Sequence, residues 1–208
     1  MNNTKQHYIS EINGRMSAIY ADLKAFVAIR MENRQHKEDG IGGGNVAMSL
    51  VLFAAIGFLA KVQYFVDVKG KVTLKDGVPF IVEEEAFVHL VRALSVANID
   101  LGLSGLKGPE LTLIWKNFRN KLVHVTTVER GHQMANFVMQ PTSGISVDKM
   151  IRLFKASSSP AFQKEEFWRV NPDVVLSFLL DITNTVNKNL GKLKLDENGL
   201  ERLDKIVG

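Results

Sequence analysis

Cysteine is absent from the 208 residues of this chain. Disulfide bonds and thiolate metal sites are therefore excluded. A chain without disulfides fits a reducing compartment, so we expect the protein to be cytoplasmic. The N-terminal stretch MNNTKQHYISEINGRM is polar and lacks the apolar core of a secretory signal, and we expect no signal peptide.

Long hydrophobic runs are scarce as well. The one uncharged stretch that suggests a membrane segment is GIGGGNVAMSLVLFAAIGFLA, between Asp39 and Lys61. Its apolar part, 46–60, is shorter than the roughly 20 residues that a spanning helix needs. We therefore expect a buried helix over 46–66 and no membrane contact. Because this helix is apolar nearly all round, it should lie at the centre of the fold.

Positive charge is in small excess over negative charge. The formal net charge is +4 and the isoelectric point is about 9.2. Such a balance is compatible with a nucleic-acid or phosphate partner but does not specify one. Hydrophobic residues make up 46% of the chain, enough to bury a sizeable core, and the length suggests one domain over 1–208.

Helical signals dominate the chain. Seven segments show apolar residues at three- and four-residue steps or helix-start residues: 8–37, 46–66, 83–97, 109–124, 147–156, 171–192 and 196–206. The clearest start is Asn171-Pro172-Asp173, which combines an N-cap residue, a first-position proline and an acid in the first turn. These segments predict a mainly α protein built as a helical bundle.

Two extended stretches interrupt the helices. In 67–82, β-branched residues flank Asp76-Gly77, a pair that tolerates the positive φ angles of a two-residue hairpin turn. A second hairpin is expected over about 124–140, with its turn at ERGH. We therefore predict two small β-hairpin embellishments on the bundle.

One face of the predicted helix 109–124 carries the side chains that phosphodiester chemistry uses. Its outward strip holds Lys116, Arg119, Asn120 and His124. Arginine can bind phosphate oxygens bidentately, and histidine can accept or donate a proton near neutral pH. RNA brings its own nucleophile, the 2′-hydroxyl, so these groups could cleave it without a metal. The alternative is a solvated helix end, because the helix dipole also favours cations there.

The stretch Arg119-Asn120-Lys121-Leu122-Val123-His124 resembles the R-x4-6-H motif of the HEPN superfamily. The resemblance implies a helical bundle, usually a homodimer, in which two motif helices meet across the two-fold axis. Many members are metal-independent ribonucleases of toxin–antitoxin, phage-defence or RNA-processing systems, and others are inactive binding modules. It implies that Arg119 and His124 are the catalytic pair, that Asn120 supports them, and that Lys116 and Lys121 add steering charge.

The glycine-rich entry GIGGGN is similar to that of uncharacterised bacterial proteins that pair it with an RN-x-x-x-H segment, which suggests a branch related to HEPN. It lacks the lysine and the preceding strand of a phosphate-binding loop, so a flexible connection is preferred. The histidines show no metal-ligand spacing, and we expect neither metal nor cofactor. Two functions stay open: an RNA endonuclease with a possible antitoxin partner, or an inactive dimeric module that binds RNA, a nucleotide or a protein.

Overall fold

The computed structural model describes residues 2–35, 43–103, 105–116, 137–139, 151–155, 166–170 and 172–208. Within these ranges the helices are α1 (Asn2–Gln35), α2 (Gly43–Asp67), α3 (Glu83–Val96), α4 (Gly108–Trp115), α6 (Pro172–Lys192) and α7 (Glu197–Val207). The strands are β1 (Thr73–Lys75), β2 (Val78–Phe80), β3 (Phe137–Met139), β4 (Ile151–Lys155) and β5 (Glu166–Val170). The described part is mainly helical, which confirms the predicted bundle with a small hairpin.

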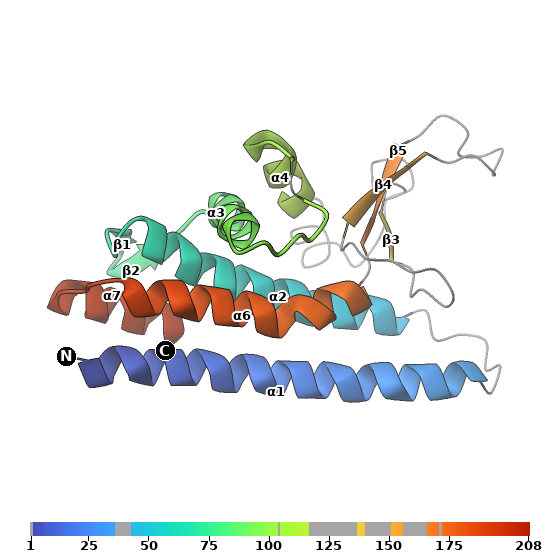
Figure 1. Ribbon diagram of the computed structural model, residues 1–208, viewed down its shortest axis with the longest axis horizontal. Coiled ribbons are helices and arrows are strands. Elements are labelled where there is room, and N and C mark those ends of the chain that lie inside the picture. Colours follow the sequence, from blue (N-terminus) through green and yellow to red (C-terminus); the bar gives the residue numbers. More distant parts are fainter. Residues whose placement is uncertain are drawn as a thin grey trace.

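The helices stack in layers (Figure 1). Helix α1 runs along one side of the bundle, α2 and α6 form the middle, and α3 and then α4 lie on the opposite side. Helix α2 packs against both α3 and α6, and α6 also packs against α1. The position of α2 follows from the sequence, because a helix that is apolar nearly all round is stable only in the middle of a bundle.

Helix α2 is the core of the bundle. Its residues 50–67 are long and apolar enough to cross a membrane, but 56% of that stretch is buried inside the fold. Leu52, Ile56, Leu59 and Phe65 are fully buried in one continuous hydrophobic core. More than half of this stretch therefore packs against other helices of the bundle.

Polar side chains near the start of α1 form hydrogen bonds with the C-terminal part of the chain. Lys5 Nζ donates hydrogen bonds to the carbonyl oxygens of Gly191 at 2.6 Å and Leu193 at 2.8 Å, at the C-terminal end of α6. The Tyr8 hydroxyl donates to Asp204 Oδ1 of α7 at 3.0 Å. Burial, followed by this hydrogen bond, raises the pKa of Tyr8 above its ordinary value. The start of α1 thus holds both C-terminal helices in place.

The predicted hairpin is present as β1 and β2. The two strands pair antiparallel, with Thr73 opposite Phe80 and Lys75 opposite Val78. Between them Asp76 has a φ of 53° and Gly77 a φ of 77°. Positive φ at both positions is the geometry of a type I′ turn, whose twist matches that of the flanking strands.

The region between α4 and α6 corrects the sequence-based expectations. Residues 151–155, expected in a helix over 147–156, form β4, and β5 was not predicted at all. β4 pairs antiparallel with β5, and β3 pairs parallel with β5, so the described part of the expected hairpin 124–140 has a partner further along the chain. The remainder of that expected hairpin lies outside the described residues. Pairing between distant segments decided these strands, and local periodicity does not report it.

Candidate functional site

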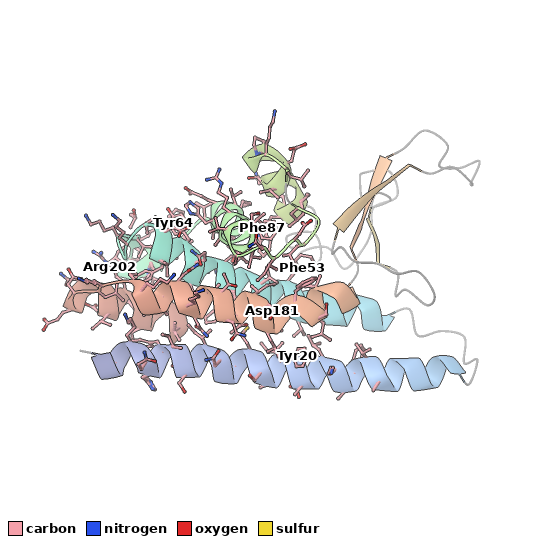
Figure 2. All side chains as sticks on the ribbon, viewed as in Figure 1. Tyr20, Phe53, Tyr64, Phe87, Asp181 and Arg202 are labelled. Atoms are coloured by element: carbon pink, nitrogen blue, oxygen red, sulfur yellow. The ribbon has the colours of Figure 1, made fainter. Side chains whose placement is uncertain are left out.

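Helix α4 is anchored to the core at the point where the motif segment begins. Leu111, Ile114 and Trp115 are buried, as the helical wheel predicted. The Trp115 ring stacks on Phe87 of α3 at 4.6 Å and meets Phe53 of α2 edge-on at 6.0 Å. Figure 2 labels these two phenylalanines, which project from neighbouring helices of the bundle. The chain therefore leaves α4 from a fixed position.

The close contact of α4 with α2 depends on a small residue. A Cβ added to Gly57 of α2 would lie 3.3 Å from Trp115 Cζ2, a tight contact. The Trp115 Nε1 atom is buried and has no hydrogen-bond partner among the residues that the structure describes. The indole is therefore held by packing alone in this part of the chain.

The structure places one of the proposed site residues. Lys116 directly follows α4, is exposed, and lines a groove of about 410 Å³. We call it the α3–α4 groove; it is lined mainly by residues of α3 and α4, among them Glu84, Glu85, His89, Arg92 and Thr112. Arg119, Asn120, Lys121 and His124 lie outside the described residues. The two carboxylates and two cations of this groove balance each other in charge.

His89 is a positioned imidazole on the wall of the α3–α4 groove. Its Nδ1 lies 2.8 Å from Asp67 Oδ2, and the side chain is 24% exposed. A carboxylate accepts hydrogen bonds, so the contact is a hydrogen bond when Nδ1 carries the hydrogen. The edge of the ring also meets the Tyr64 ring at 5.0 Å, which restricts its rotation.

A chain of hydrogen bonds supports this imidazole. Asp67 Oδ1 accepts from Gln63 Nε2 at 2.8 Å, and Gln63 Oε1 accepts from Asn189 Nδ2 at 3.1 Å. Gln63 is buried, with 1% of its surface exposed, so both ends of its amide need the partners they have. The network runs from α6 through α2 to His89 of α3 and fixes the three helices relative to one another.

Metal ligation finds no support in the part of the chain described here. Within it, no three His, Asp or Glu side chains are grouped closely enough to hold a metal ion. The acidic run Glu83-Glu84-Glu85 forms the first turn of α3, as its fit to the helix dipole predicted. Glu83 also forms an ion pair with Lys61 of α2 at 2.8 Å.

Sequence reasoning missed the Asp67–His89 pair and its amide support. The two residues lie on different helices, and only the packing of α3 on α2 brings them together. The sequence did offer one signal for this groove: His89 and Arg92 lie one turn apart on α3 and therefore share a face of the helix. Comparison of the chain with family models, with curated proteins and with solved structures finds no match.

Proposed function

We propose that the protein is a HEPN-like, metal-independent RNA endonuclease. His124 transfers the proton, Arg119 holds the scissile phosphate and Asn120 orients them. Lys116 and Lys121 attract the RNA backbone through their charge. The proposal rests on the motif in the sequence together with the helical bundle that precedes and follows it.

The observation that carries the proposal is the position of Lys116. The buried face of α4 ends at Trp115, and Lys116 emerges beside His89 and Arg92 in the α3–α4 groove. The motif begins at Arg119, three residues after Lys116, and the groove that Lys116 lines offers cations and an imidazole next to the carboxylates of Glu84 and Glu85.

The reaction needs only the groups of the motif and of RNA. The 2′-oxygen attacks phosphorus while its proton passes to the imidazole of His124, and the bond from phosphorus to the 5′-oxygen breaks. The leaving 5′-oxygen takes a proton from water, and the products are a 2′,3′-cyclic phosphate and a 5′-hydroxyl. The Arg119 guanidinium stabilises the charge that develops on the phosphate oxygens.

The test is cleavage of single-stranded RNA by the purified protein with EDTA present. We expect Arg119→Ala and His124→Ala each to lower the cleavage rate about a hundredfold or more, because each removes a group that acts in the transition state. Lys24→Ala, which removes an exposed cation from α1, is the matched control and should cleave like the wild type. Circular dichroism checks that all three variants keep the wild-type helix content.

A wild-type protein that never cleaves RNA, or that cleaves only with a divalent metal, contradicts the proposal. The second candidate function is then the inactive helical module that binds RNA, a nucleotide or a protein partner. It is favoured by a second groove, described next, that gathers three cations on α3 and α6.

A further inference from the structure

We infer that the groove between α2, α3 and α6 binds the phosphate of a nucleotide unit, either in a free nucleotide or in single-stranded RNA. This groove, called here the α6 groove, has a volume of about 720 Å³, within the range of small-ligand sites. It shares Arg92 with the α3–α4 groove but contains none of the motif residues. The inference therefore does not depend on RNA cleavage.

The α6 groove is positively charged. Arg92, Lys188 and Lys192 line it, and none of them pairs with a carboxylate in the described ranges of the chain. Asp67 is the only carboxylate among the described lining residues, and both of its oxygens are engaged, one by Gln63 and the other by His89. The lining therefore carries two more cations than carboxylates, and an anion entering the groove would balance that excess.

The types of cation suit phosphate. Arginine presents a planar fork of N–H donors that matches two phosphate oxygens, and lysine adds a mobile point charge. Arg92 comes from α3, whereas Lys188 and Lys192 are one turn apart on α6, so the charges approach the groove from two walls. A phosphate bound in the groove can contact cations from both walls. An anion bound on the open surface of one helix would reach the cations of that helix alone.

The polar face of α6 supplies hydrogen-bonding groups next to the cations. Asn184, Thr185, Lys188, Asn189 and Lys192 follow one another at helical spacing along this face. The opposite face carries the buried stripe of α6, so the polar row is held toward the groove. Thr185 Oγ1 donates to the Asp181 carbonyl oxygen and Asn189 Nδ2 to Gln63. The Asn184 amide and the oxygen atoms of Thr185 and Asn189 can still bond sugar hydroxyls or the edge of a base.

The lip of the α6 groove is apolar. Val66, Ala93, Val96 and Ala97 line it, and Val96 is 86% exposed, the most exposed of the large hydrophobic side chains that the structure describes. An apolar surface next to unpaired cations fits a ligand with a flat, weakly polar ring on one side and a phosphate on the other. A nucleotide has this combination, whereas inorganic phosphate lacks the ring.

The test is isothermal titration calorimetry of the full chain with three probes: a short 2′-O-methyl RNA, AMP and inorganic phosphate. The 2′-O-methyl group blocks the internal nucleophile, so cleavage cannot distort the binding measurement. We expect Arg92→Ala and Lys188→Ala each to weaken binding about tenfold, the effect of losing one charged hydrogen bond. Lys24→Ala makes the same charge change at an exposed position of α1, on the far side of the bundle from α3, and should change the dissociation constant less than about twofold.

Comparison of AMP with the oligonucleotide shows whether the groove binds a free nucleotide or RNA. Tight binding of AMP assigns the site to a free nucleotide. Binding of the oligonucleotide alone assigns it to RNA, and each variant of a groove cation should then reduce the salt dependence of binding by about 0.7 in logarithmic slope. Calorimetry measures binding and not cleavage, and Arg92 and Lys188 lie outside the motif, so a failure of the catalytic proposal is distinguishable from a failure of this one.

Three results would overturn the inference. The first is no measurable heat with either AMP or the oligonucleotide. The second is equal weakening by Lys24→Ala and Lys188→Ala, which would show general attraction to a basic protein. The third is binding of inorganic phosphate as tight as that of AMP, which would leave the apolar lip without a role.

Discussion

Gln63 shows how one uncharged side chain can organise charged neighbours. Its side chain projects from α2 into the buried interior, where the amide donates to Asp67 and accepts from Asn189 of α6. Because Asp67 in turn holds His89, the orientation of the imidazole depends on a residue that it does not touch. Such supporting residues fix a side chain in one rotamer and keep it ready for its ligand.

Replacing Gln63 with leucine tests this role. Leucine fills a similar volume but leaves the Asp67 and Asn189 groups without their partner, so we expect the free energy of unfolding to fall by about 1–3 kcal/mol. Chemical denaturation monitored by circular dichroism measures the change. Asn184→Leu, an exposed amide of the same groove outside the network, is the control and should change stability by less than about 0.5 kcal/mol. Equal losses in both variants would contradict the supporting role of Gln63.

Within the secondary-structure elements, replacing a glycine with alanine should change stability in opposite directions at two positions. Gly14 lies exposed in the middle of α1, with open space where a Cβ would be. Gly77 also has open space, but its φ of 77° belongs to the hairpin turn. We expect Gly14→Ala to stabilise the protein by about 1 kcal/mol through helix propensity. Gly77→Ala should destabilise it by about 1 kcal/mol, because an L-residue is strained in that turn.

Thermal unfolding of the two glycine variants measures both signs in one experiment. Since neither added methyl group meets a neighbour, packing cannot explain a difference. A stabilising Gly77→Ala would show that position 77 does not have the positive φ described, and a destabilising Gly14→Ala would contradict the open space at position 14.

Local signals were sufficient for most helices. The capping prediction at Pro172 gave the start of α6, and the apolar stripe gave its end at Lys192. For α7, Asp196 accepts a hydrogen bond from the Gly199 backbone N–H at 2.7 Å, the cap that a helix beginning at Glu197 needs. Periodicity and end signals are properties of a short window of sequence, which is why they transfer directly to the structure.

Pairing between distant segments could not be predicted. β4 and β5 are strands because they pair with each other, and neither segment shows a clean alternation on its own. The same limit applies to the grooves. The exposure of Lys116 followed from the helical wheel. The contact of Asp67 with His89, and the presence of Arg92 and Lys188 along one groove, require the packing of three helices.

For the whole molecule, the catalytic proposal implies a homodimer. In the HEPN arrangement each motif meets its own copy across a two-fold axis, so the cleft is complete only in the pair. We expect size-exclusion chromatography with light scattering to give about twice the chain mass of 23.2 kDa. If the cleft is shared, diluting the protein below the dissociation constant of that dimer should lower its specific RNA-cleaving activity. A monomer with undiminished activity would contradict the shared cleft.

The burial of Trp115 has an optical consequence. The chain has two tryptophans, and the other, Trp168, lies in β5. A Trp168→Phe variant would leave one indole, packed between Phe53 and Phe87 and therefore shielded from water and from soluble quenchers. Its blue-shifted fluorescence would then respond to any displacement of α4, the helix from which the motif segment continues. The protein thus carries an intrinsic reporter one residue before the lysine that opens its proposed catalytic segment.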